Sequence, residues 1–368
     1  MDKYRGLYVH IPFCVRKCLY CDFVSFPGME NVFDKYIDAV LEEAKKYEGM
    51  KFETVFLGGG TPSVLNCSQL DRLFDGLEKV FSFAENCEAS IEANPKTLSD
   101  EKMHVLNNHI INRVSVGVQS FNDTELKAMG RIHTSKEALE SIELISRYFD
   151  NFNIDIMTSV PFQTSDSLMN TLKTAIGTGA KHLSCYSLII EPGTPFYDMY
   201  EKGELSLLSD EEDREMYIKL AEFLGCNGYK RYEISNYARE GYECRHNIKY
   251  WTTNEYIGLG AAAHSYYNGV RFSNTPDLNS YIGGEFEQER EALTEEDKIS
   301  EYIMMSMRMS SGLDEDEFYN RFGKNFYDIN KNKIDLYTQK GFIKKTENGF
   351  AFTDKGFDVS NALLCELI

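Results

Sequence analysis

The sequence predicts an α/β protein in two parts: a partial barrel of six βα units, then a smaller α+β domain with a winged-helix-like end. Two observations indicate this fold. Strand-like apolar runs alternate with amphipathic helical segments up to about residue 235. The alternation then stops, and residues 333–368 have the pattern of a helix, a hairpin and a helix. Six βα units require a parallel sheet with right-handed crossovers, which can curl into a full or partial barrel.

The first part contains six predicted strands and five predicted helices, and several helices begin after a Ser, Asp or Thr that can cap them. The strands are expected at residues 7–10, 54–57, 89–93, 113–118, 152–156 and 182–188. The helices are expected at residues 33–47, 70–81, 100–107, 136–149 and 167–178. Ligand sites of such sheets lie at the C-terminal ends of the strands, so we expect functional residues directly after each strand.

The second part is predicted to begin after residue 235, which divides the chain into domains 1–235 and 236–368. It contains a polar and aromatic stretch up to residue 274 and an acidic helical passage at 287–309. Asn348-Gly349 is the expected turn of the hairpin near the end. Its acidic surroundings favour a packing or lid role for the winged-helix-like end over DNA binding.

Composition and charge indicate a folded cytoplasmic protein that does not bind nucleic acid. The chain has 368 residues, enough for about two domains. Hydrophobic residues make up 42% of it and charged residues 26%, which is ordinary for a globular protein. The net charge of −19 argues against general binding to phosphate backbones. We expect a cytoplasmic location because the N-terminus lacks an apolar signal region and no long apolar run follows.

Three of the nine cysteines, Cys14, Cys18 and Cys21, crowd into one short segment directly after the first predicted strand. Thiolates suit zinc and iron–sulfur clusters. A structural zinc site has four protein ligands. Three cysteines on a four-iron cluster instead leave one iron without a protein ligand, so that this iron can bind another molecule. The alternative is a zinc site completed by His10 or a remote thiol. The other cysteines are scattered, and we expect most of them to be buried free thiols; they are residues 67, 87, 185, 226, 244 and 365.

A glycine run, Gly58-Gly59-Gly60-Thr61-Pro62, follows the second predicted strand. Bare backbone at this place can approach a ligand and offer N–H donors. The alternative is a tight turn between strand and helix. A second glycine-rich segment, 258–263, lacks the acidic partner of a dinucleotide fingerprint, so we expect close backbone packing there.

Polar residues also stand where the later strands end. Glu92 ends the third strand, Gln119 ends the fourth and Asp155 lies in the fifth. Arg131 adds a fork-shaped donor that suits a carboxylate. The alternative for each is a hydrogen-bonded polar residue of the barrel mouth with no ligand.

The spacing Cys-x3-Cys-x2-Cys and the phrase Tyr8-Val-His-Ile-Pro-Phe-Cys resemble the HemN and HemW branch of the radical-SAM superfamily. The resemblance implies a [4Fe–4S] cluster on the three cysteines, whose open iron binds S-adenosylmethionine. An electron from the cluster then cleaves the sulfonium to a 5′-deoxyadenosyl radical. An electron donor such as flavodoxin or ferredoxin is implied as well. The resemblance carries over these adenosylmethionine-binding positions: Tyr8, Tyr20, Gly59, Gly60, Thr61, Glu92, Gln119, Arg131 and Asp155.

Two features favour the heme-chaperone side of this branch. The dehydrogenase side continues the triad as Cys-x-Cys, whereas this chain has Cys21-Asp22-Phe23. Residues 245–251 match the HNxxYW motif that is associated with heme binding. The resemblance spans nearly the whole chain, with strong motifs up to residue 265.

The HNxxYW segment offers groups that suit heme. His246 can bind iron, and Tyr250 and Trp251, the one tryptophan of the chain, present flat faces. Arg245 and Lys249 can meet propionates. The alternative is that the aromatic residues are core anchors and His246 is a structural, hydrogen-bonded residue. Rival iron ligands are Cys244 and, more weakly, His264 and His133.

The resemblance therefore implies a heme chaperone that delivers heme to apo-hemoproteins such as respiratory cytochromes, with at most transient membrane contact. Coproporphyrinogen dehydrogenase activity is not expected. The alternatives from the same branch are an oxygen-independent coproporphyrinogen III dehydrogenase and a radical-SAM methyltransferase or heme-modifying enzyme.

Overall fold

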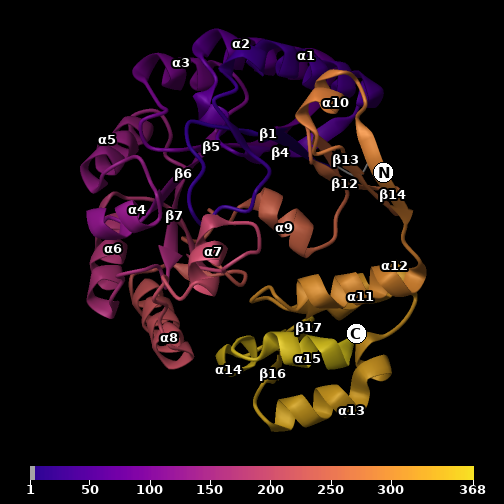
Figure 1. Cartoon of the computed structure of the whole chain (residues 1–368). Helices are drawn as coiled ribbons and strands as arrows, with labels where there is room; N and C mark the ends of the chain where they lie inside the picture. Colours follow the sequence, from indigo (N-terminus) through magenta and orange to yellow (C-terminus); the bar gives the residue numbers. More distant parts are fainter. Residues whose placement is uncertain (1–4) are drawn as a thin grey trace.

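The computed structural model describes residues 5–368 and is built around one curved sheet of 12 strands (Figure 1). In order across the sheet the strands are β14 (Glu287–Ala292), β13 (Val270–Asn274), β12 (His264–Tyr267), β11 (Tyr256–Leu259), β1 (Arg5–Ile11), β4 (Lys51–Gly59), β5 (Ser82–Ala93), β6 (Arg113–Gln119), β7 (Phe152–Thr158), β8 (His182–Ser187), β10 (Asn236–Ala238) and β9 (Lys230–Arg231). Strands β1, β4, β5, β6, β7 and β8 are parallel neighbours, and each overlaps one predicted strand. Within the described residues β14 and β9 do not pair, so the predicted partial barrel is confirmed.

Helices cover the outer, convex side of the parallel strands (Figure 1). They are α1 (Phe33–Ala44), α2 (Cys67–Val80), α3 (Asp100–Asn108), α4 (Asp123–Ala128), α5 (Ser135–Ser146), α6 (Ser165–Gly177) and α8 (Asp210–Cys226). Five of them match the predicted helices, and Ser99, Thr134 and Thr164 cap α3, α5 and α6 as expected. The prediction missed α8, because this helix buries only Met216, Leu220 and Leu224 and so has a narrow apolar stripe.

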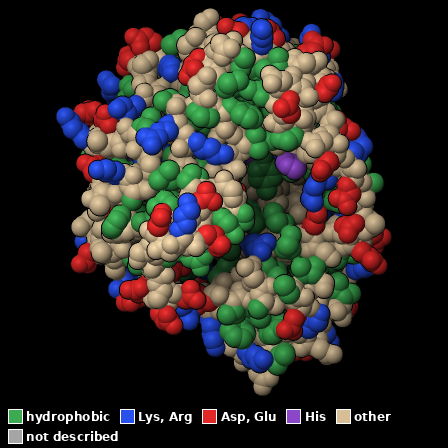
Figure 2. Space-filling view, in the orientation of Figure 1, with side chains coloured by type: hydrophobic (Ala, Val, Ile, Leu, Met, Phe, Trp, Pro, Cys, Tyr) green, Lys and Arg blue, Asp and Glu red, His purple; other side chains and the backbone are tan. Residues whose placement is uncertain are grey.

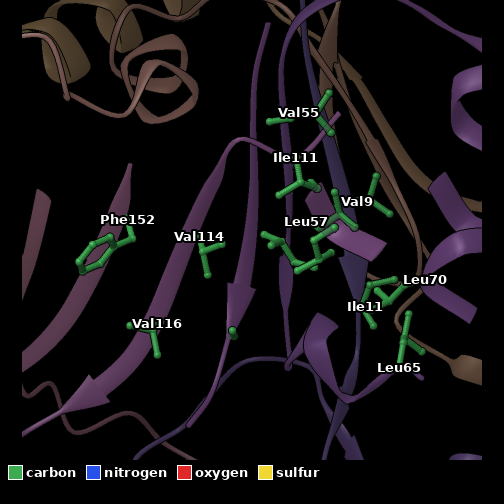
Figure 3. Close-up of a cluster of buried hydrophobic side chains, with 14 of the residues drawn as sticks. Val9, Ile11, Val55, Leu57, Leu65, Leu70, Ile111, Val114, Val116 and Phe152 are labelled. Atoms are coloured by element: carbon green, nitrogen blue, oxygen red, sulfur yellow. The ribbon is translucent and has the colours of Figure 1, made fainter. Parts of the chain in front are cut away.

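The parallel strands have two chemically different faces. On the outer face Val9, Val55 and Val114 are fully buried in the largest hydrophobic core, together with Leu70 of α2 (Figure 3). Burying each such side chain contributes roughly 1.5–3 kcal/mol to folding. The residues between them point to the inner face and are mostly polar, as Asp155 in β7 illustrates. The core therefore lies between sheet and helices, and the inner face is left for other contacts.

Residues 236–292, which we expected in the second domain, extend the first sheet instead. Strand β11 runs parallel to β1, and β12 to β14 follow it antiparallel. Their apolar side chains, together with those of α10 (Leu278–Ile282), belong to the same core as the barrel. The prediction of helix at 287–292 is wrong, because these residues form the exposed edge strand β14, whose charged side chains discourage further pairing.

A second, separate hydrophobic core is built from residues 302–367. Its elements are α11 (Glu295–Ser306), β15 (Leu313–Asp314), α12 (Glu315–Phe322), α13 (Phe326–Gln339), β16 (Ile343–Lys345), β17 (Gly349–Phe352), α14 (Asp354–Phe357) and α15 (Ser360–Leu367). The three strands form their own sheet, in the order β15-β17-β16. We therefore propose that the chain divides near residue 293 into a barrel unit and a winged-helix-like C-terminal unit, rather than at residue 235.

Ion pairs and hydrogen bonds fasten the C-terminal unit to the barrel unit. Arg321 of α12 donates to the carbonyl oxygen of Thr252 at 2.9 Å and to Asn254 Oδ1 at 3.1 Å. On the other side, Arg231 pairs with Asp354 at 2.7 Å. The two units are thus joined at several places, among them the Arg271–Glu301 ion pair at 2.6 Å. None of the helices in residues 5–368 has both the length and the apolar character that crossing a bilayer requires.

Close backbone packing explains the glycines of segment 258–263, as predicted. A Cβ at Gly258 would lie 2.2 Å from the carbonyl oxygen of His264, and one at Gly260 would lie 2.5 Å from that of His10. Gly260 also has a φ of +104°, which disfavours any residue with a side chain. Its N–H donates to the buried carboxylate of Glu43 in α1 at 2.9 Å. This glycine therefore lets β11 approach both β1 and α1.

Replacing Gly260 with Ala should destabilise the fold by about 3 kcal/mol or more, because backbone strain and a steric clash add up. A thermal unfolding curve measures the loss as a lower Tm. Gly177→Ala is the matched control, because a Cβ at Gly177 of α6 meets no atom within 4 Å. Equal Tm values for the two variants would contradict this packing account.

Candidate functional site

A cavity of about 550 Å³ lies on the inner side of the curved sheet. It extends from the loops after the parallel strands down to α9 (Arg245–Trp251), and Figure 2 shows the molecule hollowed beside this helix, with hydrophobic side chains on the walls. Every site residue expected from the sequence lines it: Cys14, Cys18, Cys21, Tyr8, Tyr20, Gly59, Gly60, Thr61, Glu92, Gln119, Arg131, Asp155 and His246. Residues from seven strands and loops are thus brought to one place. This was expected, because the C-terminal ends of parallel strands meet at one edge of the sheet.

The segment with the three cysteines is held at both of its ends. At its start β2 (Phe13–Cys14) pairs with β3 (Phe26–Pro27), which fixes Cys14 beside the end of β1. Near its other end the Leu19 N–H donates to the Met129 carbonyl at 3.1 Å. The Leu19 carbonyl in turn accepts from the N–H of Phe196, in α7 (Pro195–Glu201), at 3.0 Å. The thiols are therefore positioned by backbone contacts before anything binds them.

A chain of polar contacts joins two of the thiols through the cavity wall. Arg131 Nη1 donates to Cys18 Sγ at 3.3 Å, and Arg131 Nη2 donates to Asn94 Oδ1 at 2.5 Å. Asn94 Nδ2 donates to Thr61 Oγ1 at 2.6 Å, and Thr61 Oγ1 lies 3.6 Å from Cys14 Sγ. The guanidinium expected to bind a carboxylate is therefore engaged with the site's own side chains.

The alternative of a zinc site completed by His10 is not supported. Both ring nitrogens of His10 have partners: Nδ1 lies 2.9 Å from the Tyr8 hydroxyl and Nε2 lies 3.1 Å from the Val24 carbonyl. Within residues 5–368 no three His, Cys, Asp or Glu side chains converge on a point where a single ion could sit. A four-iron cluster places each thiolate on a different iron, so its cysteines need not converge in this way. Burial raises the pKa of Cys21 to about 11, so its thiol must lose a proton to bind metal.

The glycine run is shaped by close approach to β1 and to the cysteine segment. Gly59 has a φ of +112°, and a Cβ there would lie 2.5 Å from the His10 ring. A Cβ at Gly60 would lie 2.6 Å from the carbonyl oxygen of Phe13. Only glycine fits either position, so this backbone forms a bare wall of the cavity beside Cys14. A ligand can reach its N–H and C=O groups there.

Two half-buried carboxyl groups, Glu92 and Asp155, face the cavity. Burial, helped by the charge of Asp155, raises the pKa of Glu92 to about 8. Glu92 Oε2 accepts from the Gly59 N–H at 3.1 Å. Burial also raises the pKa of Asp155, although Asn153 Nδ2 donates to it at 2.6 Å. A pair of this kind suits a cationic ligand, because a positive charge would favour both ionised forms.

Several cavity residues were not found from the sequence, among them Asn94, Arg113, Asn153 and Ser184. Arg113 is only 2% exposed, and its Nε has no hydrogen-bond partner. Each lies on or directly after a strand, at the position whose side chain turns inward. The alternation of polar and apolar residues along each strand was the signal that could have revealed them. Gln119 lies at the end of β6, where the pairing of β6 with β7 shifts register, and its φ is +71°. Its side chain is therefore brought to the cavity by a strained backbone conformation.

The HNxxYW segment forms α9, which closes the lower end of the cavity. The Glu88 carboxylate accepts from the N–H groups of Arg245 at 3.2 Å and of His246 at 3.1 Å, so an acid satisfies the helix N-terminus. His246 is 1% exposed. Its Nδ1 lies 2.9 Å from Thr54 Oγ1 and its Nε2 lies 2.9 Å from the Tyr250 hydroxyl. Both ring nitrogens therefore have partners, which agrees with the alternative that His246 is a structural, hydrogen-bonded residue. Burial lowers the pKa of His246 to about 3.

Tyr250 also lines the cavity, whereas the remaining residues expected near heme do not. Arg245 and Lys249 both pair with Glu53 instead of meeting propionates. Cys244 is fully buried, with its thiol 3.6 Å from Glu88. His133 is 4% exposed and contacts the Val118 carbonyl, and His264 begins strand β12 at the other side of β11. Half-buried Trp251 does not line the cavity either.

The comparisons with known proteins agree with this geometry. Residues 8–175 match the model of the Radical SAM superfamily, and residues 293–359 match the model of the HemN C-terminal domain. The protein named heme chaperone HemW of Lactococcus lactis subsp. lactis is 34% identical, over 98% of this chain and 96% of its own. The protein of the same name from Bacillus subtilis is 35% identical, over 96% of both chains.

A solved structure supports the fold. Coproporphyrinogen III oxidase (HemN) from Escherichia coli, described as a radical SAM enzyme, superposes with a TM-score of 0.86 at 24% identity. The match covers 100% of this chain and 90% of that chain. The partial barrel with its C-terminal unit is therefore a known arrangement.

Replacing Cys14, Cys18 or Cys21 with Ala should abolish the brown absorbance of the anaerobically reconstituted protein, because we expect each thiolate to hold one iron of the cluster. Cys226→Ala and Cys365→Ala are the controls, since both thiols are exposed and far from the cavity. Absorbance spectra and iron content report the outcome. Equal iron loss from the control variants would overturn the ligand assignment.

Adenosylmethionine binding should depend on pH through Glu92. Its pKa of about 8 means that the carboxyl is largely protonated at pH 6.5. The ligand's sulfonium keeps its positive charge at every pH and pairs best with the ionised carboxylate, so affinity should rise about tenfold or more from pH 6.5 to 8 and level off above about pH 9. Equilibrium dialysis measures the constant at each pH. In Glu92→Gln binding should be weaker and the rise absent, and a rise that persists would exclude Glu92 as its source.

Proposed function

This chain belongs to the HemW family of radical-SAM proteins, and on that basis we propose that it binds heme and delivers it to apo-hemoproteins such as respiratory cytochromes. The observation that carries the proposal is the similarity to proteins named heme chaperone HemW over both units of the chain. The relative from Escherichia coli is 32% identical over 98% of this chain. The sequence Cys21-Asp22-Phe23 supports the same side of the branch.

Radical-SAM membership implies a [4Fe–4S] cluster and S-adenosylmethionine as cofactors. We propose Cys14, Cys18 and Cys21 as the cluster ligands. When bound, the cluster can pass an electron to the sulfonium of adenosylmethionine. The chain's own residues hold the thiols in place, present bare glycine backbone and half-buried carboxyl groups to the ligand, and exclude water from the inner face of the sheet.

We also propose a cytoplasmic setting with an electron donor such as flavodoxin or ferredoxin. All nine cysteines are free, which suits a reducing compartment. Recipients in a membrane would need only transient contact with this chain. The winged-helix-like unit is proposed to pack against the barrel and not to bind DNA, because its junction is already engaged through Arg231 and Arg321.

An anaerobic heme titration of the reconstituted protein, read by absorbance, tests the function. We expect stoichiometric heme binding and transfer to an apo-hemoprotein, without conversion of coproporphyrinogen III in the presence of adenosylmethionine and reductant. Steady formation of protoporphyrinogen would assign the chain to the dehydrogenase instead. Methylated or ring-opened products would point to a modifying enzyme.

The role of His246 is tested in the same titration. Because both ring nitrogens have partners, we expect His246→Ala to leave the iron absorbance bands of bound heme unchanged. The variant should instead lose ~2–4 kcal/mol of stability, because Thr54 and Tyr250 lose their buried partner and a void remains. A shift of the iron bands with unchanged Tm would identify His246 as the iron ligand.

A further inference from the structure

The proposed contacts assign the barrel cavity to adenosylmethionine. A volume of about 550 Å³ is in the range of a site for one small molecule. The proposed cluster and adenosylmethionine contacts reach from the mouth to the middle of this cavity, and α9 closes its lower end. A tetrapyrrole macrocycle that binds together with adenosylmethionine therefore needs a place outside these contacts, and the mouth of the same cavity offers one.

The mouth carries large apolar side chains that are unusually exposed. Phe23, from the cysteine segment, is 63% exposed, and Ile189, after β8, is 67% exposed. Tyr186, at the end of β8, is 41% exposed. All three also line the cavity, so they surround its opening from two sides. Apolar side chains gathered around an opening mark a binding surface more often than isolated ones do.

Two cations stand on the same rim. Arg16 and Lys17 both line the cavity mouth. Lys17 donates to the Phe23 carbonyl at 2.9 Å, whereas Arg16 is exposed and has no ion-pair or hydrogen-bond partner within residues 5–368. Asp22 and Glu191 are the acidic residues of this rim. A dianionic ligand would therefore turn its charged edge towards Arg16 and Lys17.

We propose that heme lies across the barrel mouth, with its ring against Phe23, Tyr186 and Ile189 and its propionates towards Arg16 and Lys17. This inference rests on the proposed function, since it assigns the heme site of that same chaperone. A ring in this position covers bound adenosylmethionine without replacing it. It also leaves one face of the heme open to solvent, from which a recipient protein can take it.

The first experiment is a heme titration of the reconstituted protein with saturating adenosylmethionine. Ile189→Ser and Phe23→Ser should each weaken heme binding tenfold or more, with adenosylmethionine affinity and cluster absorbance unchanged in Ile189→Ser. Phe162→Ser is the matched control, because Phe162 is 75% exposed but does not line the cavity. Unchanged heme affinity in the two rim variants, while the parent binds heme, would overturn the rim site. Failure of the parent to bind heme would instead overturn the proposed function.

A second experiment tests the orientation. Arg16→Gln should weaken binding of heme several-fold but leave binding of heme dimethyl ester unchanged, since the ester lacks the charged propionates. Lys136→Gln is the control, because the Lys136 side chain is 84% exposed and lies outside the cavity. An equal loss for heme and for its ester would contradict the propionate contact. Displacement of heme by adenosylmethionine would place heme inside the barrel and reject the proposal.

Discussion

The alternation of apolar and polar residues along the parallel strands is the constraint on which this structure depends. Parallel sheets covered by helices on both faces have strands that are apolar throughout. Here only the outer face, with Val9, Val55 and Val114, packs on helices, and the inner face carries groups such as Glu92 and Asp155. Buried polar groups are costly unless they find partners, so the inner face cannot close on itself as an apolar core. The result is an open barrel whose interior is a polar cavity. Burial raises the pKa values of both carboxyl groups, and a cationic ligand in this cavity would lower them again.

The two ends of this cavity differ. At the lower end Glu88 caps the N-terminus of α9, and His246 joins the helix to Thr54 of β4. The HNxxYW residues therefore form the lower end of the barrel. Arg245 and Lys249 belong to this helix, and both pair with Glu53 and not with a ligand. At the upper end the cysteine segment is tied by backbone and side-chain contacts but remains partly exposed. The proposed heme rim lies at this end.

The sequence was sufficient to predict the parallel strands and the cysteine segment, because each rests on a local pattern, and the resemblance supplied part of the set of residues that line the cavity. It was not sufficient to predict strand β11, which pairs with β1 across some 250 residues and carries no signal of that partnership. The division that we propose near residue 293 has no local signal either, since residues 236–292 differ in local rhythm but share the core of the barrel. The partners of His246 could not be foreseen either. A histidine that binds iron and one that holds two hydroxyl groups look alike until Thr54 and Tyr250 are brought to its ring.

One short segment links the cluster site to the proposed heme rim. Residues 14–23 carry the three thiols and also Arg16, Lys17 and Phe23. The chain of contacts from Cys18 through Arg131, Asn94 and Thr61 to Cys14 fixes this segment against β4 and β5, so the thiols need little reordering to take up a cluster. The same order serves the proposed rim, because Arg16, Lys17 and Phe23 lie on the backbone that positions the thiols, and a preordered surface loses less conformational entropy when a ligand binds. The cluster site and the proposed heme rim therefore share one preordered segment, and a change that loosens this segment would weaken both.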